Sequence, residues 1–215
     1  IAAIKNGVHK VRINPGNIGG KEKVREVVKC LKDYDIPVRI GVNSGSLEKD
    51  LLEKYKHPTA EALVESAYRS ISYFNEFDYD NIVLSIKSSD VTTTIDANRL
   101  FSEKYNYPLH LGVTEAGAEL TGIVRSSVGL GTLLKEGIGD TIRVSLTGKS
   151  SDEVIVGKEI LTSLGLMEEG VRIVSCPTCG RCKTDTLSIV KEIKKKTMHI
   201  KKPITVAVMG CAVNG

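Results

Sequence analysis

The stretch NIVLSIKSSDVTTTIDANRLFSEKYNYPLHLGV, residues 81–113, decides the fold class. It begins with a short β-branched run, passes through a polar loop into an amphipathic helical segment, and ends after Pro108 in a second apolar run. A unit of this kind predicts two parallel strands joined by a right-handed helical crossover. Both runs are mostly apolar, as expected for strands that helices cover.

The same strand–loop–helix pattern repeats through residue 165. The predicted strands lie at 9–13, 36–42, 81–87, 109–113 and 141–146. The predicted helices lie near 21–32, 47–74 with a break at Pro58, 92–105, 121–136 and 152–164. Five consecutive βα units fit either a doubly wound sheet or part of a (β/α)8 barrel. No Gly-x-Gly-x-x-Gly follows a predicted strand, so nothing supports a Rossmann dinucleotide site.

The composition is that of an ordinary soluble globular protein. Of the 215 residues, 41% are hydrophobic and 26% are charged, which excludes a disordered chain. No apolar run approaches the roughly 20 residues that a membrane span needs. A net charge of +4, 5% aromatic residues and no Trp argue against a nucleic-acid surface. Because the chain begins at Ile1, we expect a fragment or a processed product.

Polar and charged residues near the ends of the predicted strands favour the barrel, since barrel enzymes build their active sites at that edge. Arg12, Arg39 and Lys87 are cations that recur there, and Asn43 and Ser145 join them. Three cations at one mouth repel each other unless an anion binds. They therefore predict a phosphorylated substrate, aided by the Gly-rich loop NPGNIGG at 14–20. Weaker polar candidates are Asn14, Ser44, Ser88 and Asn214.

Glu115 is the only carboxylate placed directly at the end of a predicted barrel strand. That position suits a catalytic proton donor at the barrel mouth. The alternative role is an ion pair with one of the nearby cations, and the two roles are compatible.

Four of the five cysteines lie in the last 40 residues, where the strand–helix pattern changes. Predicted strands at 171–175 and 204–211 flank a helix at 185–197, so we divide the chain into domains 1–166 and 167–215. Cys176, Cys179 and Cys182 lie in one loop, and Cys211 lies in a second. An intracellular α/β enzyme keeps its thiols reduced, so a metal is favoured over disulfides. Zinc and an iron–sulfur cluster both use this spacing, and spacing alone leaves the choice open.

Seven ordered motifs resemble the bacterial 4-hydroxy-3-methylbut-2-enyl diphosphate synthases, enzymes of the methylerythritol phosphate route to isoprenoids. The resemblance covers essentially the whole chain, and seven motifs in one order are far more specific than a lone Cys-x-x-Cys. The motifs are VRINPGNIG (11–19), RIGVNSGSL (39–47), LSIKSSD (84–90), GVTEAG (112–117), RVSLTG (143–148), SCPTCGR (175–181) and MGCAVNG (209–215).

The resemblance implies the last five βα units of a (β/α)8 TIM barrel followed by a small α/β iron–sulfur domain. It implies a [4Fe–4S] cluster held by Cys176, Cys179 and Cys211, with a Glu expected beyond Gly215 as the fourth ligand. The family usually has a non-Cys residue where this chain has Cys182. We expect Cys182 to be an inert neighbour, because a fourth thiolate would close the cluster and leave it only an electron carrier.

The resemblance also implies the reaction. A cyclic substrate, 2-C-methyl-D-erythritol 2,4-cyclodiphosphate, is reductively opened to 4-hydroxy-3-methylbut-2-enyl diphosphate with two electrons from ferredoxin or flavodoxin. Arg12, Arg39, Asn43, Lys87 and Ser145 match substrate-facing positions, and Glu115 serves as the proton donor. The expected assembly is a bacterial cytoplasmic homodimer in which the cluster domain of one subunit covers the barrel of the other. No membrane or nucleic-acid partner is expected, and the chain alone should be inactive.

Two other functions fit parts of the pattern. A sugar-phosphate aldolase or transferase with a structural zinc appendage would also need a cation-rich barrel mouth. A non-catalytic zinc-ribbon module could bind nucleic acid through the Lys-rich segment near residues 194–202, although the low aromatic content disfavours it.

Overall fold

The chain divides into two compact units, Ile1–Ile160 and Leu161–Gly215. The structure is a computed structural model, and it describes residues 1–14, 18, 21–168 and 170–213. Residues 15–17 and 19–20 of the predicted Gly-rich loop and the candidate Asn214 lie outside these ranges. Within the described ranges, no helix is both long and apolar enough to span a lipid bilayer.

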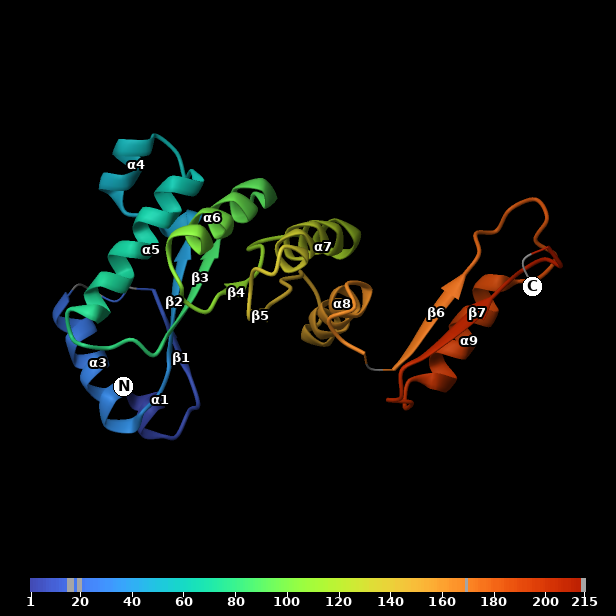
Figure 1. Ribbon diagram of the computed structural model, residues 1–215, viewed down its shortest axis with the longest axis horizontal. Coiled ribbons are helices and arrows are strands. Elements are labelled where there is room, and N and C mark those ends of the chain that lie inside the picture. Colours follow the sequence, from blue (N-terminus) through green and yellow to red (C-terminus); the bar gives the residue numbers. More distant parts are fainter. Residues whose placement is uncertain (15–17, 19–20, 169, 214–215) are drawn as a thin grey trace. The chain divides into compact units, whose positions relative to one another are not determined.

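Parallel strands in sequence order form the centre of the first unit (Figure 1). β1 pairs with β2, β2 with β3, and β4 with β5, all in parallel. A parallel bridge between Leu84 and Leu109 brings the approach to β4 beside β3. The five strands therefore run in the order of consecutive units of a (β/α)8 barrel. They are β1 (Val11–Ile13), β2 (Val38–Asn43), β3 (Ile82–Lys87), β4 (His110–Leu111) and β5 (Thr141–Ile142).

Helices follow each of these strands, as the right-handed crossover rule requires. The helices are α1 (Ala2–Lys5), α3 (Lys21–Tyr34), the 3-10 helix η1 (Ser44–Ser46), α4 (Lys49–Tyr55), α5 (Ala60–Asn75), α6 (Val91–Lys104), α7 (Glu119–Lys135) and α8 (Ser150–Ser163). Figure 1 shows α5 and α6 running along the strands that they cover.

The apolar core lies between the sheet and its helices. Val38 and Ile40 of β2 and Leu84 of β3 are fully buried, as are Phe74 of α5 and Phe101 of α6. Each such side chain contributes about 1.5–3 kcal/mol when it is removed from water. Successive strand residues point to opposite faces, so the residues of β2 and β3 that alternate with the buried ones lie on the other face of the sheet. Those alternate residues form the site described below.

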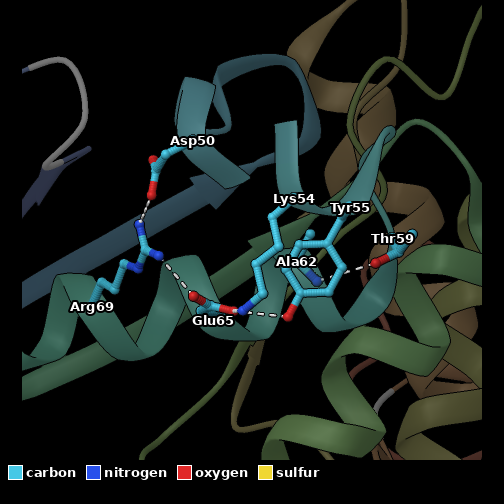
Figure 2. Close-up of polar contacts among 7 residues, drawn as sticks. All are labelled: Asp50, Lys54, Tyr55, Thr59, Ala62, Glu65 and Arg69. Atoms are coloured by element: carbon cyan, nitrogen blue, oxygen red, sulfur yellow. Dashed lines mark hydrogen bonds and ion pairs between the residues drawn. The ribbon is translucent and has the colours of Figure 1, made fainter. Parts of the chain in front are cut away.

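The break predicted at Pro58 separates α4 from α5. Pro58 cannot continue a helix because it lacks a backbone N–H, and the next residue, Thr59, caps α5 by accepting a hydrogen bond from the Ala62 amide at 3.2 Å. Glu65 of α5 joins the two helices by accepting hydrogen bonds from Lys54 at 2.6 Å and Tyr55 at 2.8 Å (Figure 2).

Arg69, one turn further along α5, completes this network. It donates to Glu65 at 2.7 Å and also pairs with Asp50 of α4 (Figure 2). The hydrogen bond from Lys54, together with that from Tyr55, lowers the pKa of Glu65 to about 2. A carboxylate held by three donors therefore fixes the short helix α4 on α5.

β4 and β5 are shorter than the predicted runs 109–113 and 141–146. Only His110 with Thr141 and Leu111 with Ile142 form ladder pairs. The segment after β5 nevertheless stays alongside β4, because the Arg143 amide donates to the Leu111 carbonyl at 2.9 Å.

The helix α1 was not predicted, since its four residues show too little periodicity for a sequence signal.

The second unit is a smaller β–α–β arrangement. β6 (Val171–Ser175) pairs in parallel with β7 (Ile204–Val208), and α9 (Thr186–Thr197) connects them and lies along both strands (Figure 1). Asp185 caps α9 by accepting a hydrogen bond from the Ser188 amide at 3.1 Å. Because the strands are parallel, their carboxyl ends meet at one edge, and the cysteine-bearing loops follow there.

Candidate active site

A polar pocket of about 240 Å³ lies on the strands of the first unit. It extends from Arg39, near the start of β2, to Asn43 and Lys87 at the carboxyl ends of β2 and β3. Its lining includes all five predicted substrate residues, together with five that the sequence did not single out as substrate ligands. The lining residues are Arg12, Arg39, Gly41, Val42, Asn43, Ser85, Lys87, Thr114, Arg143 and Ser145.

Strand register explains why these residues meet. Arg12 of β1 lies opposite Arg39 of β2, and Asn43 of β2 lies opposite Lys87 of β3. In a parallel sheet, paired residues share a face, so alternate residues of neighbouring strands form rows across it. Burial of the intervening apolar residues under the helices leaves these rows to line the pocket. The cations of several strands are thereby gathered into one small volume.

The electrostatics of the pocket are strongly positive. Four cations line it, and none of the described lining residues is acidic. Burial lowers the pKa of Lys87 to about 8, and the neighbouring guanidinium groups act in the same direction. Burial likewise lowers the pKa of Arg39, with Arg12 as the next cause. The protein thus holds its cations where each destabilises the others, and a bound anion would relieve this repulsion.

Two glycines make the close approach of the cations possible. A Cβ atom at Gly41 would lie 2.8 Å from Nε of Arg12, and one at Gly112 would lie 2.7 Å from Nζ of Lys87. Any larger residue at these positions would push the charged groups out of place. Glycine therefore leaves the space that the side chains of Arg12 and Lys87 occupy across the backbone.

Arg143 is the functional candidate that sequence reasoning missed. It lies two residues before the predicted Ser145, and both line the pocket. Alternation along the run TIRVSL was the signal that could have found it, because residues 143 and 145 share a face. Glu153 of α8 supports this segment: it lies 3.8 Å from Nε of Arg143 and accepts a hydrogen bond from the Leu146 amide at 3.0 Å.

Glu115 lies beside the pocket without lining it. It directly follows Thr114, a lining residue, and its side chain is exposed. Within the described chain it forms no ion pair, and its φ of 52° is a left-handed conformation that few non-glycine residues adopt. Backbone outliers of this kind cluster at functional sites. A role for Glu115 in proton transfer stays a prediction.

His110 lies two residues before Gly112, in the row below Lys87. It is buried, and its Nδ1 lies 2.8 Å from Oγ1 of Thr141. Burial, aided by the charge of Lys87, lowers the pKa of His110 to about 3, so the imidazole is neutral. His110 does not line the pocket, whose positive charge comes from Lys and Arg alone.

The weaker candidates make local contacts. Asn14 donates to Ser46 Oγ at 2.8 Å, and Ser88 Oγ accepts from the Asp90 amide at 3.1 Å. Asn43 Oδ1 accepts from the Gly45 amide at 3.2 Å, which caps the short 3-10 helix and fixes the amide side chain. Ser44 begins that helix and does not line the pocket.

Two loops of the second unit carry the predicted metal ligands. Cys176 follows β6, its amide donates to the Val208 carbonyl of β7 at 3.2 Å, and its sulfur accepts from the Gly210 amide at 3.2 Å. Gly210 immediately precedes Cys211. The strand pair therefore brings the two cysteine-bearing loops into direct contact, and all the cysteines are free thiols.

The predicted ligands are cysteine thiols, which are the residue type that binds an iron–sulfur cluster. No three His, Cys, Asp or Glu side chains in the described ranges converge as they would on a single metal ion. A cluster needs its thiolates on separate irons, so convergence on one point is not required. An amide N–H directed at the Cys176 sulfur is the kind of hydrogen bond that stabilises a cluster thiolate.

Comparison with known proteins places this geometry in a family. Residues 1–158 match the family described as the GcpE TIM-barrel domain, and residues 172–215 match the GcpE protein C-terminal domain. The chain belongs to the GcpE family. The predicted family resemblance and the predicted partial TIM-barrel fold are thereby confirmed.

Curated relatives of the GcpE chain share the name 4-hydroxy-3-methylbut-2-en-1-yl diphosphate synthase (flavodoxin). Those of Clostridium perfringens and Thermodesulfovibrio yellowstonii are 57% and 58% identical over 215 residues, which is 100% of this chain and 62% of each relative. The relative from Geobacter sulfurreducens is 52% identical and is covered to 61%. The chain thus spans about three-fifths of the length of the relatives it matches.

Proposed function

We propose that this chain contributes the substrate pocket and the cluster ligands of an enzyme that reductively opens 2-C-methyl-D-erythritol 2,4-cyclodiphosphate. The product is 4-hydroxy-3-methylbut-2-enyl diphosphate, and the balance is two electrons and two protons consumed with one water released. The observation that carries the proposal is the acid-free pocket in which four cations meet. The shared name of the relatives supports the same reaction. In this proposal, residues 1–166 bind substrate and residues 167–215 hold the cluster.

The pocket cations would bind the diphosphate. Arg12, Arg39 and Arg143 can each present paired N–H donors to phosphate oxygens, whereas Lys87 provides a compact point charge. Asn43 and Ser145 add neutral donors at the same opening. Because the product keeps both phosphates, these contacts to the diphosphate can persist through the reaction and orient the carbon skeleton for reduction.

Glu115 would deliver a proton to the oxygen that leaves as water. Its place directly after a lining residue puts it at the edge of the diphosphate site, where it need not compete with phosphate for the cations. A carboxylic acid within hydrogen-bond reach of the leaving oxygen lowers the barrier to C–O cleavage.

Cys176, Cys179 and Cys211 would hold a [4Fe–4S] cluster, with the fourth ligand, a Glu, supplied beyond Gly215. When bound, the cluster supplies the two electrons and a Lewis-acidic iron. The chain's own contribution is to keep the Cys176 loop against the Cys211 loop through the contacts between β6 and β7.

Flavodoxin is the proposed electron donor, since the relatives carry that word in their name, and ferredoxin is the second candidate. A homodimer in which the cluster segment of one subunit serves the barrel of the other would bring the two sites together. Free thiols throughout the described chain suit a reducing cytoplasm.

Anaerobic purification of the full-length protein tests the proposal. We expect a brown protein with about four irons per chain that converts the cyclic diphosphate when reduced flavodoxin is supplied. A colourless protein that retains only zinc after cluster reconstitution would refute it. Aldol or transfer activity toward sugar phosphates in such a zinc protein would support the alternative enzyme class.

A further inference from the structure

Cys182 is the thiol of the cysteine loop for which the proposed function has no role. It lies in the same loop as Cys176 and Cys179, and its amide donates to the Cys179 carbonyl at 2.9 Å. Its sulfur lies 3.2 Å from the Thr184 carbonyl oxygen and 3.2 Å from Oγ1 of Thr186. Thr186 is only 3% exposed, so the sulfur is directed at the buried start of α9.

The Cys182 sulfur also lies directly against Gly210. A Cβ atom at Gly210 would lie 2.4 Å from the sulfur of Cys182 and 2.6 Å from Oγ1 of Thr186. No side chain fits at residue 210 without displacing both groups. Cys182 therefore contacts the backbone immediately before Cys211, a residue that comes from the other end of the β–α–β arrangement.

Hydrogen bonds on both sides of Gly210 strengthen this contact. The amide of Lys183, next to Cys182, donates to the Gly210 carbonyl at 2.9 Å. The amide of Gly210 donates to the Cys176 sulfur at 3.2 Å. Gly210, the residue before Cys211, is thus hydrogen-bonded both to the start and to the end of the cysteine loop.

We propose that Cys182 is a positioning residue that clips the Cys211 loop to the cysteine loop 176–182. It does so as a small hydrogen-bonding side chain that bridges Gly210 and Thr186, and it is not itself a cluster ligand. The inference rests on the proposed function in one respect, namely that Cys176, Cys179 and Cys211 bind a cluster. Serine keeps the size and the hydrogen-bond donor of Cys182, whereas alanine removes both.

Cluster retention in the full-length protein tests the clip. Wild type, Cys182→Ser and Cys182→Ala are reconstituted anaerobically beside Cys179→Ser, which removes a ligand, and Cys30→Ala, which removes a buried thiol elsewhere. Iron and sulfide per chain, the visible spectrum and the rate of iron loss to a chelator are measured.

We expect Cys182→Ser to match wild type and Cys30→Ala in all three measurements. Cys182→Ala should load its cluster but lose iron about threefold to tenfold faster, the factor that one ordinary hydrogen bond is worth. Failure of Cys182→Ser to load, as for Cys179→Ser, would make Cys182 a ligand and overturn the proposal. Iron loss from Cys182→Ala at the wild-type rate would overturn it as well.

Hydrogen exchange of the Lys183 amide in the cluster-free protein separates the clip from the proposed function. This amide should exchange faster in Cys182→Ala and at the wild-type rate in Cys182→Ser, because only alanine frees the Gly210 loop. Equal exchange in all three proteins would refute the clip. A wild-type protein that assembles no iron–sulfur cluster would refute the proposed function, and the exchange comparison would still decide the role of Cys182.

Discussion

Lys87 makes anion binding depend on pH in a way that can be worked out from the structure. Burial lowers its pKa to about 8, so the anion-free protein carries this charge only in part under mildly alkaline conditions. A diphosphate in the pocket favours the protonated amine and raises the pKa again. Binding should therefore be accompanied by proton uptake, and affinity should fall as the pH rises past about 8. Guanidinium groups do not lose their proton over this range, so the pH dependence comes from Lys87.

The size of the effect follows from the fraction of protonated Lys87. With a pKa of about 8 in the free protein, nearly all of the amine is charged at about pH 7 and about one tenth at about pH 9. The dissociation constant for pyrophosphate should rise about tenfold over that interval. Lys87→Met should bind weakly at every pH and lose this dependence. Comparison of the two proteins cancels the ionisation of pyrophosphate itself.

Calorimetric titration of the full-length protein with pyrophosphate, in buffers of different ionisation enthalpy, measures both affinity and proton uptake. A thermal melt shows whether Lys87→Met still folds. At neutral pH we expect it to be more stable than wild type by about 1–3 kcal/mol, since a pKa lowered from 10.5 to about 8 marks a charge that the fold disfavours below its folded pKa. Affinity independent of pH in the wild type, or the same tenfold fall in Lys87→Met, would refute this account.

Three further outcomes are expected. Gly41→Ala should weaken pyrophosphate binding about tenfold with little loss of folding, because the added Cβ would lie 2.8 Å from Nε of Arg12, whose flexible side chain can move aside; unchanged affinity would contradict the packing argument. Glu65→Gln should lower stability by about 1 kcal/mol at neutral pH after allowance for solvent screening, as measured by denaturant titration. This stabilisation is present above the unfolded pKa of about 4.5 and is lost as the pH falls toward 2. The exposed Glu53→Gln is the control, and an equal loss of unfolding free energy in it at neutral pH would contradict the prediction. Glu115→Gln should keep the cluster spectrum but lose most turnover with reduced flavodoxin, and full turnover would exclude Glu115 from proton transfer.

The sequence predicted five of the ten pocket residues, because polar and charged side chains recur along its predicted strands. Asn43 and Lys87 end their strands, as a site at the carboxyl edge of a parallel sheet requires, whereas Arg39 is the second residue of β2 and lies opposite Arg12 in the middle of β1. Arg143 shares a face with Ser145, so alternation could have found it, but alternation alone does not show which residues of a face enter a pocket. Cys182 shows the same limit, since spacing places four thiols together but does not give their directions.

The sequence by itself determined the α/β class, the order of the βα units, the break at Pro58 and the cysteine loops. These features depend on neighbouring residues, whose periodicity and turn chemistry act over a few positions. Only the tertiary structure decided that four cations from separate strands meet over Gly41 and Gly112, that the pKa of Lys87 falls to about 8, and that the Cys182 sulfur is directed at Gly210. The physical reason is that burial, electric field and close packing depend on strand register and on contacts between residues far apart in the chain, which no local pattern records.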